Sequence, residues 1–170
     1  MSESGVVVEV SNRQRRLKVA APWVRRLVTE ACAAIGIDAA EISVVLLGDA
    51  AMAKVNEEWL EHEGPTDVIT FGLSEATDEV EVWPGGLTGD IVVSTETACR
   101  VAAELGWSAE NELAYYIVHG LLHLAGYDDT TAPPRAAMRR EERRVMKAIG
   151  LPPPPRRPAS ALRQPSPKTR

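Results

Sequence analysis

The chain has 170 residues, of which 45% are hydrophobic and 25% are charged, and its formal net charge is −5. This composition is typical of a globular protein with a single buried core, and it argues against a chain that is disordered throughout. No run of apolar residues approaches the roughly 18 that a membrane span needs. The N-terminal residues also lack the pattern of a secretory signal. We therefore expect a cytoplasmic protein with no membrane partner.

The charge is divided unevenly along the chain. Residues 1–150 carry a formal charge of −10, whereas residues 151–170 carry +5 and include seven prolines. Repeated proline prevents helix formation and favours an extended, solvated chain. We predict one domain over residues 1–150 and a disordered tail over residues 151–170. The tail is either a simple linker remnant or a flexible arm that attracts nucleic-acid phosphates.

The order of the predicted elements indicates the fold class. Segments rich in β-branched residues predict four strands, at residues 6–10, 41–47, 67–71 and 90–94. Helical patterns are predicted at residues 22–35, 50–60, 95–105 and 109–125, and from Pro134 onwards. Strands interleaved with helices predict one α/β domain, with a four-stranded, mostly parallel or mixed sheet and about five surrounding helices.

Two further segments have a characteristic pattern. Residues 74–86 contain several acids, a proline and two glycines, and are predicted to form an exposed loop. The last helix is predicted to be an amphipathic cover, with its arginines and glutamates on the solvent side. Its buried side is predicted to carry Met138, Val145, Met146 and Ile149.

Two of the chain's three histidines, His119 and His123, lie on one predicted helix. Residues four apart share a helix face, so both imidazoles can reach one ion. Gly126 is expected to end the helix, and the turn after it can bring Asp128 or Asp129 to the same ion. Two imidazoles and one carboxylate fit a zinc site with an open fourth position, as catalytic zinc sites have. The alternative is a histidine pair that is packed or hydrogen-bonded without a metal.

The residue after the first histidine bears on the reaction class. Zinc peptidases with an HExxH motif keep a glutamate there as general base. Here that position is Gly120, so a metallopeptidase would lack its base. A glycine also leaves space near the ligands for a bulky substrate or a neighbouring backbone.

Several motifs are shared with one protein family. HGLLHLAGYDD, at residues 119–129, resembles the HGxLHLxGYDH signature of the YbeY family, bacterial endoribonucleases that act in ribosomal RNA maturation. GPTDVITF, at residues 64–71, resembles the family's PTDVLSF segment, and TGDIVVS, at residues 88–94, resembles its GDI strand. Asn56 and Trp59 fall where the family has an N-x-x-aromatic helix end.

This resemblance implies a zinc-dependent endoribonuclease that cleaves single-stranded RNA. Its partner would be ribosomal RNA or the ribosome, in 16S ribosomal RNA maturation and ribosome quality control, with no specificity for DNA. The resemblance also implies one zinc ion per chain, bound by His119, His123 and the residue at position 129. The family has histidine at that position, whereas this chain has Asp129, and a carboxylate oxygen is an accepted zinc ligand. The alternative is a non-hydrolytic ribosome-assembly factor in which the metal mainly stabilises the fold.

A further set of residues is expected in the cleft around the metal or in contact with its ligands. Asp67 and Asp90 stand at the start of predicted strands, where a carboxylate accepts backbone N–H groups, accepts an N–H from a ligand imidazole or contacts an RNA sugar. Thr66 is either a turn hydroxyl or a substrate contact. The full set of candidates is Asn56, Thr66, Asp67, Asp90 and Asp128, of which Asp128 is expected to hold the turn.

One cationic position of the family is missing. The arginine that follows the family's aromatic residue aligns with Leu60, so this chain has no positive charge there for a phosphate group. His62 or an arginine from another segment is a possible replacement, and the sequence does not distinguish the two.

Overall fold

The computed structural model describes residues 5–60, 67–72 and 86–156. Within these residues, four strands form one sheet: β1 (Gly5–Asn12), β2 (Ala39–Leu47), β3 (Val68–Gly72) and β4 (Leu87–Ser94). Their order across the sheet is β1-β2-β4-β3. The β1, β2 and β4 strands are parallel, and β3 is antiparallel to β4. The predicted four-stranded mixed sheet is confirmed.

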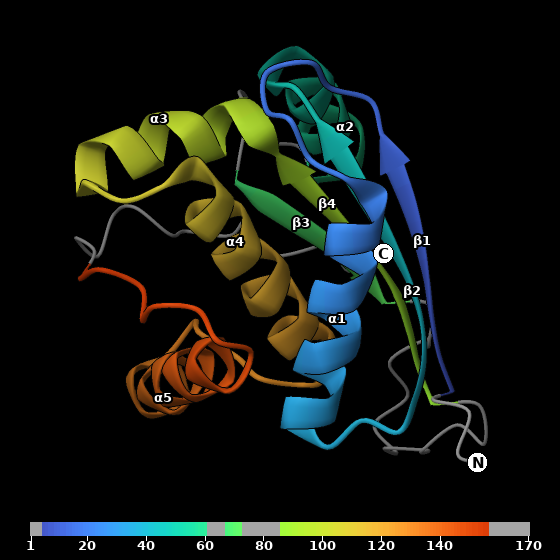
Figure 1. The fold of residues 1–170 in the computed structure, drawn as a ribbon, viewed down its shortest axis with the longest axis vertical. Coiled ribbons are helices and arrows are strands. Elements are labelled where there is room, and N and C mark those ends of the chain that lie inside the picture. Colours follow the sequence, from blue (N-terminus) through green and yellow to red (C-terminus); the bar gives the residue numbers. More distant parts are fainter. Residues whose placement is uncertain (1–4, 61–66, 73–85, 157–170) are drawn as a thin grey trace.

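The described residues also form five helices, which agree with the predicted ones. They are α1 (Ala21–Ile35), α2 (Asp49–Leu60), α3 (Thr95–Leu105), α4 (Ala109–Leu124) and α5 (Ala132–Ala148). In Figure 1, α1 and α4 lie across one face of the sheet, and α5 packs beside them. The predicted single α/β domain is therefore confirmed.

Successive side chains of β4 pack into two different hydrophobic clusters, one on each face of the sheet. Ile91 and Val93 belong to the main buried cluster, which includes side chains of α1, α4 and α5. Val92 lies between them and packs with Met52 of α2 in a smaller cluster. Because successive side chains of a strand point to opposite faces, α4 covers one face of the sheet and α2 lies against the other. A polar side chain of a strand therefore points either toward α4 or toward α2, according to its position in the strand.

Gly120 allows α4 to lie close to the sheet. A Cβ atom at this position would lie 3.0 Å from Ile91 Cγ2, 3.1 Å from Thr70 Cγ2 and 3.3 Å from Val68 Cγ2. The space expected beside this glycine is thus filled by side chains of β3 and β4, not left open to a substrate. A glutamate at position 120 would have to enter this packed layer.

We expect Gly120→Val to lower the free energy of unfolding by about 1–3 kcal/mol, the usual cost of overpacking a core. Urea denaturation followed by circular dichroism measures the change. The matched control is Ala103→Val, which places the same side chain at an exposed position of α3 and should cost about 1 kcal/mol or less. Equal effects of the two substitutions would contradict the close contact between α4 and the sheet.

Several predictions concern residues outside the described ranges. They are the loop over most of residues 74–86, the roles of Thr66 and His62, and the tail beyond residue 156, and all stay predictions. At the start of the predicted tail, Leu151 packs against the main cluster, and its N–H donates to Met146 O at 2.9 Å. None of the helices in the described part of the chain is long and apolar enough to cross a membrane.

Candidate metal centre

Both predicted histidines lie on α4, whose first turn is stabilised by the local sequence. The Ser108 hydroxyl accepts a hydrogen bond from Asn111 N–H at 3.1 Å and caps the helix. Glu110 and Glu112 occupy the first turn, where the positive end of the helix dipole favours acids. His119 follows two turns later on the buried side of the helix, and its side chain is 2% exposed.

The chain reverses sharply after α4. Gly126 has a φ of 103°, a left-handed conformation that glycine adopts without strain. Its N–H donates to His123 O, and Tyr127 N–H donates to Leu122 O, both at 3.0 Å. These two hydrogen bonds close the end of the helix. The predicted end near Ala125 is confirmed, and the following residues return to the helix face that carries the histidines.

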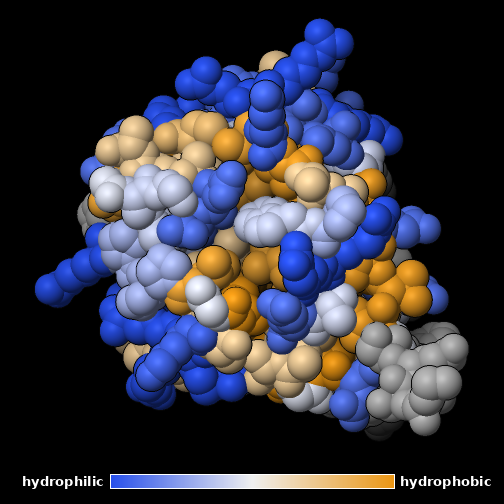
Figure 2. Space-filling model, in the orientation of Figure 1, coloured by the Kyte–Doolittle hydropathy of each residue, from blue (hydrophilic) through white to orange (hydrophobic). Residues whose placement is uncertain are grey.

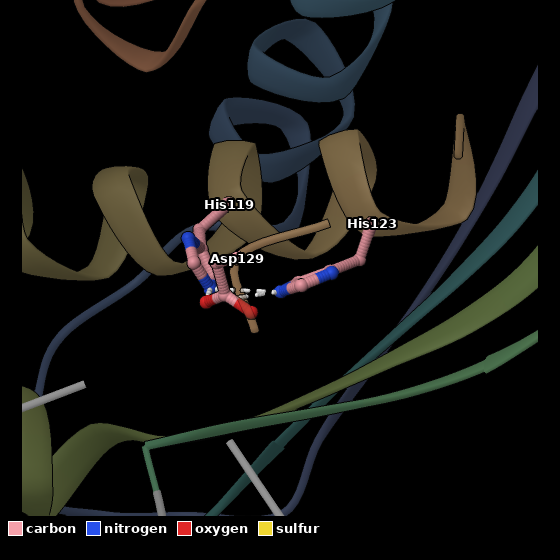
Figure 3. A group of neighbouring side chains, drawn as sticks. All are labelled: His119, His123 and Asp129. Atoms are coloured by element: carbon pink, nitrogen blue, oxygen red, sulfur yellow. Dashed lines mark hydrogen bonds and ion pairs between the residues drawn. The ribbon is translucent and has the colours of Figure 1, made fainter. Parts of the chain in front are cut away.

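Three donor atoms converge on one point on the side of α4 that faces the strands (Figure 3). His119 Nε2 and His123 Nε2 lie 3.1 Å apart, and Asp129 Oδ2 lies 3.6 Å from each of them. In a tetrahedral zinc site with bonds of about 2.0–2.1 Å, ligand atoms lie about 3.3 Å apart. The observed separations bracket this value. The donor set therefore has the size of a zinc site.

The contacts on the far side of each imidazole support the same conclusion. His123 Nδ1 lies 3.1 Å from Tyr127 O, which accepts a hydrogen bond only if Nδ1 carries the proton. His119 Nδ1 lies 3.5 Å from Glu142 Oε2, which likewise favours a proton on Nδ1. Both Nε2 lone pairs and the Asp129 carboxylate then face one another. The facing lone pairs and carboxylate repel one another unless a proton or a metal ion lies between them, so the residues fit a divalent metal.

Negative charge surrounds the two imidazoles. Burial lowers the pKa of His119, but the carboxylates of Glu142, Asp67 and Asp129 outweigh it and hold this pKa above its usual value. Burial likewise opposes ionisation of Asp129, yet His123 and His119 keep the pKa of its carboxyl below the usual value. The site therefore favours an ionised carboxylate and attracts positive charge.

Glu142 is the residue of this site that the sequence prediction missed. The glutamates of α5 were predicted on the solvent side, but the Glu142 side chain is 4% exposed and faces His119. The prediction was wrong for Glu142 because position 142 lies four residues after Met138 and three before Val145, inside the buried stripe of the helix. The position of this glutamate within the apolar stripe of the helix was the sequence pattern that could have predicted its burial.

Two of the cleft candidates lie close to the donors. Asp128 Oδ1 accepts from Thr130 N–H at 2.9 Å and its Oδ2 accepts from the Thr130 hydroxyl at 2.8 Å. Both bonds lower the pKa of Asp128, and they hold the turn that presents the third donor. Asp67 is 7% exposed and accepts from Val68 N–H at 2.8 Å, while its charge raises the pKa of His119. Asp67 thus combines a turn contact with proximity to the histidine.

Asp90 and Asn56 belong to the other layer. Leu124 of α4 lies against Gly89, and Ile91 faces Gly120, so Asp90 between them points to the face that α2 covers. Burial raises the pKa of its carboxyl. Asn56 is 2% exposed and follows Met52 by one helical turn, on the side of α2 that packs against that same face. Asp90 is therefore not placed to accept an N–H from either histidine.

Comparisons with known proteins agree with the motifs. A sequence model of the family described as Endoribonuclease YbeY matches residues 9–150. A protein named Endoribonuclease YbeY from Geobacter metallireducens is 37% identical, with 71% of this chain and 79% of that protein covered. One of the same name from Moorella thermoacetica is 40% identical, with 74% and 84% covered. A solution structure of a Thermotoga maritima protein has a TM-score of 0.57 and 22% identity, with 83% of this chain and 90% of that chain covered. The resemblance carried by the motifs is confirmed, and the chain belongs to the Endoribonuclease YbeY family.

Proposed function

We propose that this protein is a zinc-dependent endoribonuclease that cleaves single-stranded RNA in ribosomal RNA processing. One observation carries the proposal: His119, His123 and Asp129 converge with the spacing of a zinc site, in a chain whose curated relatives are named endoribonucleases. The proposal includes a role in 16S ribosomal RNA maturation and in ribosome quality control, which the resemblance of the motifs implies.

Each residue of the centre has a distinct part in this proposal. His119, His123 and Asp129 would hold the metal. Zinc at this place would supply Lewis acidity for the hydrolysis of a phosphodiester. Glu142 and the Tyr127 carbonyl orient the two imidazoles, because each contacts the ring nitrogen that does not face the metal.

The packing around α4 separates this proposal from a metallopeptidase. The residue after the first histidine lies against β3 and β4, so this place has no room for the glutamate that such peptidases use as a base. A non-hydrolytic ribosome-assembly factor is the remaining alternative. It differs from the proposed enzyme in one measurable respect, because it binds zinc and RNA without cutting the RNA.

We expect the purified protein to cut a labelled single-stranded fragment of ribosomal RNA, to lose this activity with a chelator and to regain it when zinc is added. Metal analysis of the same protein should find one zinc ion per chain. DNA of the same sequence and casein, tested in parallel, should remain intact. Chelator-sensitive digestion of casein would favour the peptidase, and zinc binding without RNA cleavage would favour the assembly factor.

A further inference from the structure

One flank of α5 is strongly basic although the domain as a whole is acidic. The helix carries six basic and two acidic residues, whereas residues 1–150 together carry −10. Arg139, Arg140 and Arg143 are exposed, and Arg135 is half-buried. Figure 2 shows hydrophilic side chains gathered over α5, at the lower left of the view. The positive charge of this helix is thus concentrated on a surface available to a ligand.

These arginines form a groove. An open groove of about 320 Å³ runs along the flank of α5, and its lining is Ala132, Arg135, Ala136, Arg139, Arg140 and Arg143. At 1.5 Å per residue, the lining residues extend over about 16 Å of the helix. The small alanine side chains leave room between the long guanidinium groups. The groove therefore offers several cationic donors in a row.

The acids of α5 do not neutralise this groove. Glu141 pairs with Arg144, with 2.7 Å between its Oε1 and Arg144 Nε, and Glu142 is buried against His119. Among the described residues, neither carboxylate forms an ion pair with an arginine of the groove. Guanidinium groups that have no acidic partner in the described part of the chain repel one another, so a polyanion that contacts them all relieves this repulsion.

The first arginine of the groove contacts the loop that carries the third metal donor. Arg135, in the first turn of α5, donates from Nε to Asp129 O at 3.0 Å and from Nη2 to Thr130 O at 3.4 Å. The loop that presents the third donor to the metal is therefore attached to the first arginine of the groove.

We propose that the arginine groove of α5, lined by Arg135, Arg139, Arg140 and Arg143, binds the phosphates of the RNA strand on one side of the bond to be cut. This inference rests on the proposed function. RNA fits better than an acidic protein segment, because Arg135 of the groove is bonded to the loop of a centre whose proposed substrate is a phosphodiester. Guanidinium groups also match phosphate oxygens in two-point contacts. Contacts to phosphates alone make the binding independent of sequence.

The test compares two triple variants that remove the same charge. One is Arg139→Gln/Arg140→Gln/Arg143→Gln, in the groove. The control is Arg16→Gln/Arg25→Gln/Arg26→Gln, which alters three exposed arginines outside it. Arg135 is left unchanged because it holds the loop that carries Asp129. The binding of a fluorescent single-stranded RNA with a cleavage-resistant phosphorothioate backbone, which keeps its negative charges, is measured by anisotropy on the zinc-loaded proteins over a range of salt concentrations, and a gel confirms that it stays uncut.

We expect the groove variant to weaken RNA binding and to reduce the slope of log affinity against log salt by about 2, since each contact to a single strand contributes about 0.7. The control should leave the slope unchanged, and both variants should bind zinc as tightly as the parent protein. Equal slopes of log affinity against log salt in the two variants would contradict the proposal that the groove binds RNA. So would a groove variant that loses binding to a poly-glutamate peptide but not to RNA. If the parent protein neither binds nor cuts RNA, the proposed function fails, and the groove proposal fails with it.

Discussion

Replacing Asp129 with alanine is expected to lower the affinity for zinc by at least about 10- to 100-fold, a loss that even an indirect contact to a metal ligand can cause. Asp129 Oδ2 lies 3.6 Å from both imidazole nitrogens, so the substitution removes one of three donors. RNA cleavage should fall in parallel. Competition with a chromogenic chelator measures the affinity, and a labelled RNA fragment reports the activity.

Two companion variants distinguish the ligand from its neighbour in the turn. Asp129→His restores a third donor of a type that zinc accepts, so it should retain the metal. Asp128→Ala removes two hydrogen bonds to Thr130 and should loosen the turn, while zinc affinity changes much less. If Asp128→Ala lost the metal and Asp129→Ala kept it, the assignment of the third ligand would be reversed.

The parts of the fold that local chemistry determines were predictable from the sequence. Ser108 caps α4 and Gly126 ends it, and both signals act within one helical turn. The orientation of β3 was not predictable in this way, because it depends on pairing with β4, which is distant in the sequence. The sequence therefore indicated a mostly parallel or mixed sheet without identifying the antiparallel strand.

In the candidate site, too, local patterns were predictable from the sequence and contacts between distant elements were not. Helical spacing alone placed His119 and His123 together, but it left Asp128 and Asp129 as equal candidates, because both follow the same turn. The family resemblance favoured Asp129, and the structure places its carboxylate between the two imidazoles. The direction of Asp90 was not predictable, since strand alternation does not tell which face α4 covers. Contacts between elements, which a local pattern does not encode, decide such positions.

Glu142 provides the second large expected effect. Its carboxylate is buried, and Oε2 lies 3.5 Å from His119 Nδ1, on the side of the ring away from the other two donors. A carboxylate in this position orients a ligand imidazole and keeps the proton on Nδ1, which leaves Nε2 free to bind the metal. We expect Glu142→Ala to lower zinc affinity by about 10- to 100-fold, the loss typical for such a contact. Glu142→Gln preserves the shape of the side chain but not its charge. Its zinc affinity should lie between those of Glu142→Ala and the parent protein.

The neighbouring acid on α5 supplies the control for this prediction. Glu141 pairs with Arg144, whose side chain is 50% exposed, and such surface pairs contribute about 0–1 kcal/mol to stability. Glu141→Ala should therefore leave zinc affinity unchanged. The zinc-induced rise in melting temperature provides an independent measurement, because a tenfold loss of affinity removes about 1.4 kcal/mol of zinc-dependent stabilisation. If Glu142 orients His119, the Glu142→Ala variant should lose much of this rise and the Glu141→Ala variant should keep it. An equal rise in both variants would show that Glu142 does not help to hold His119 for the metal.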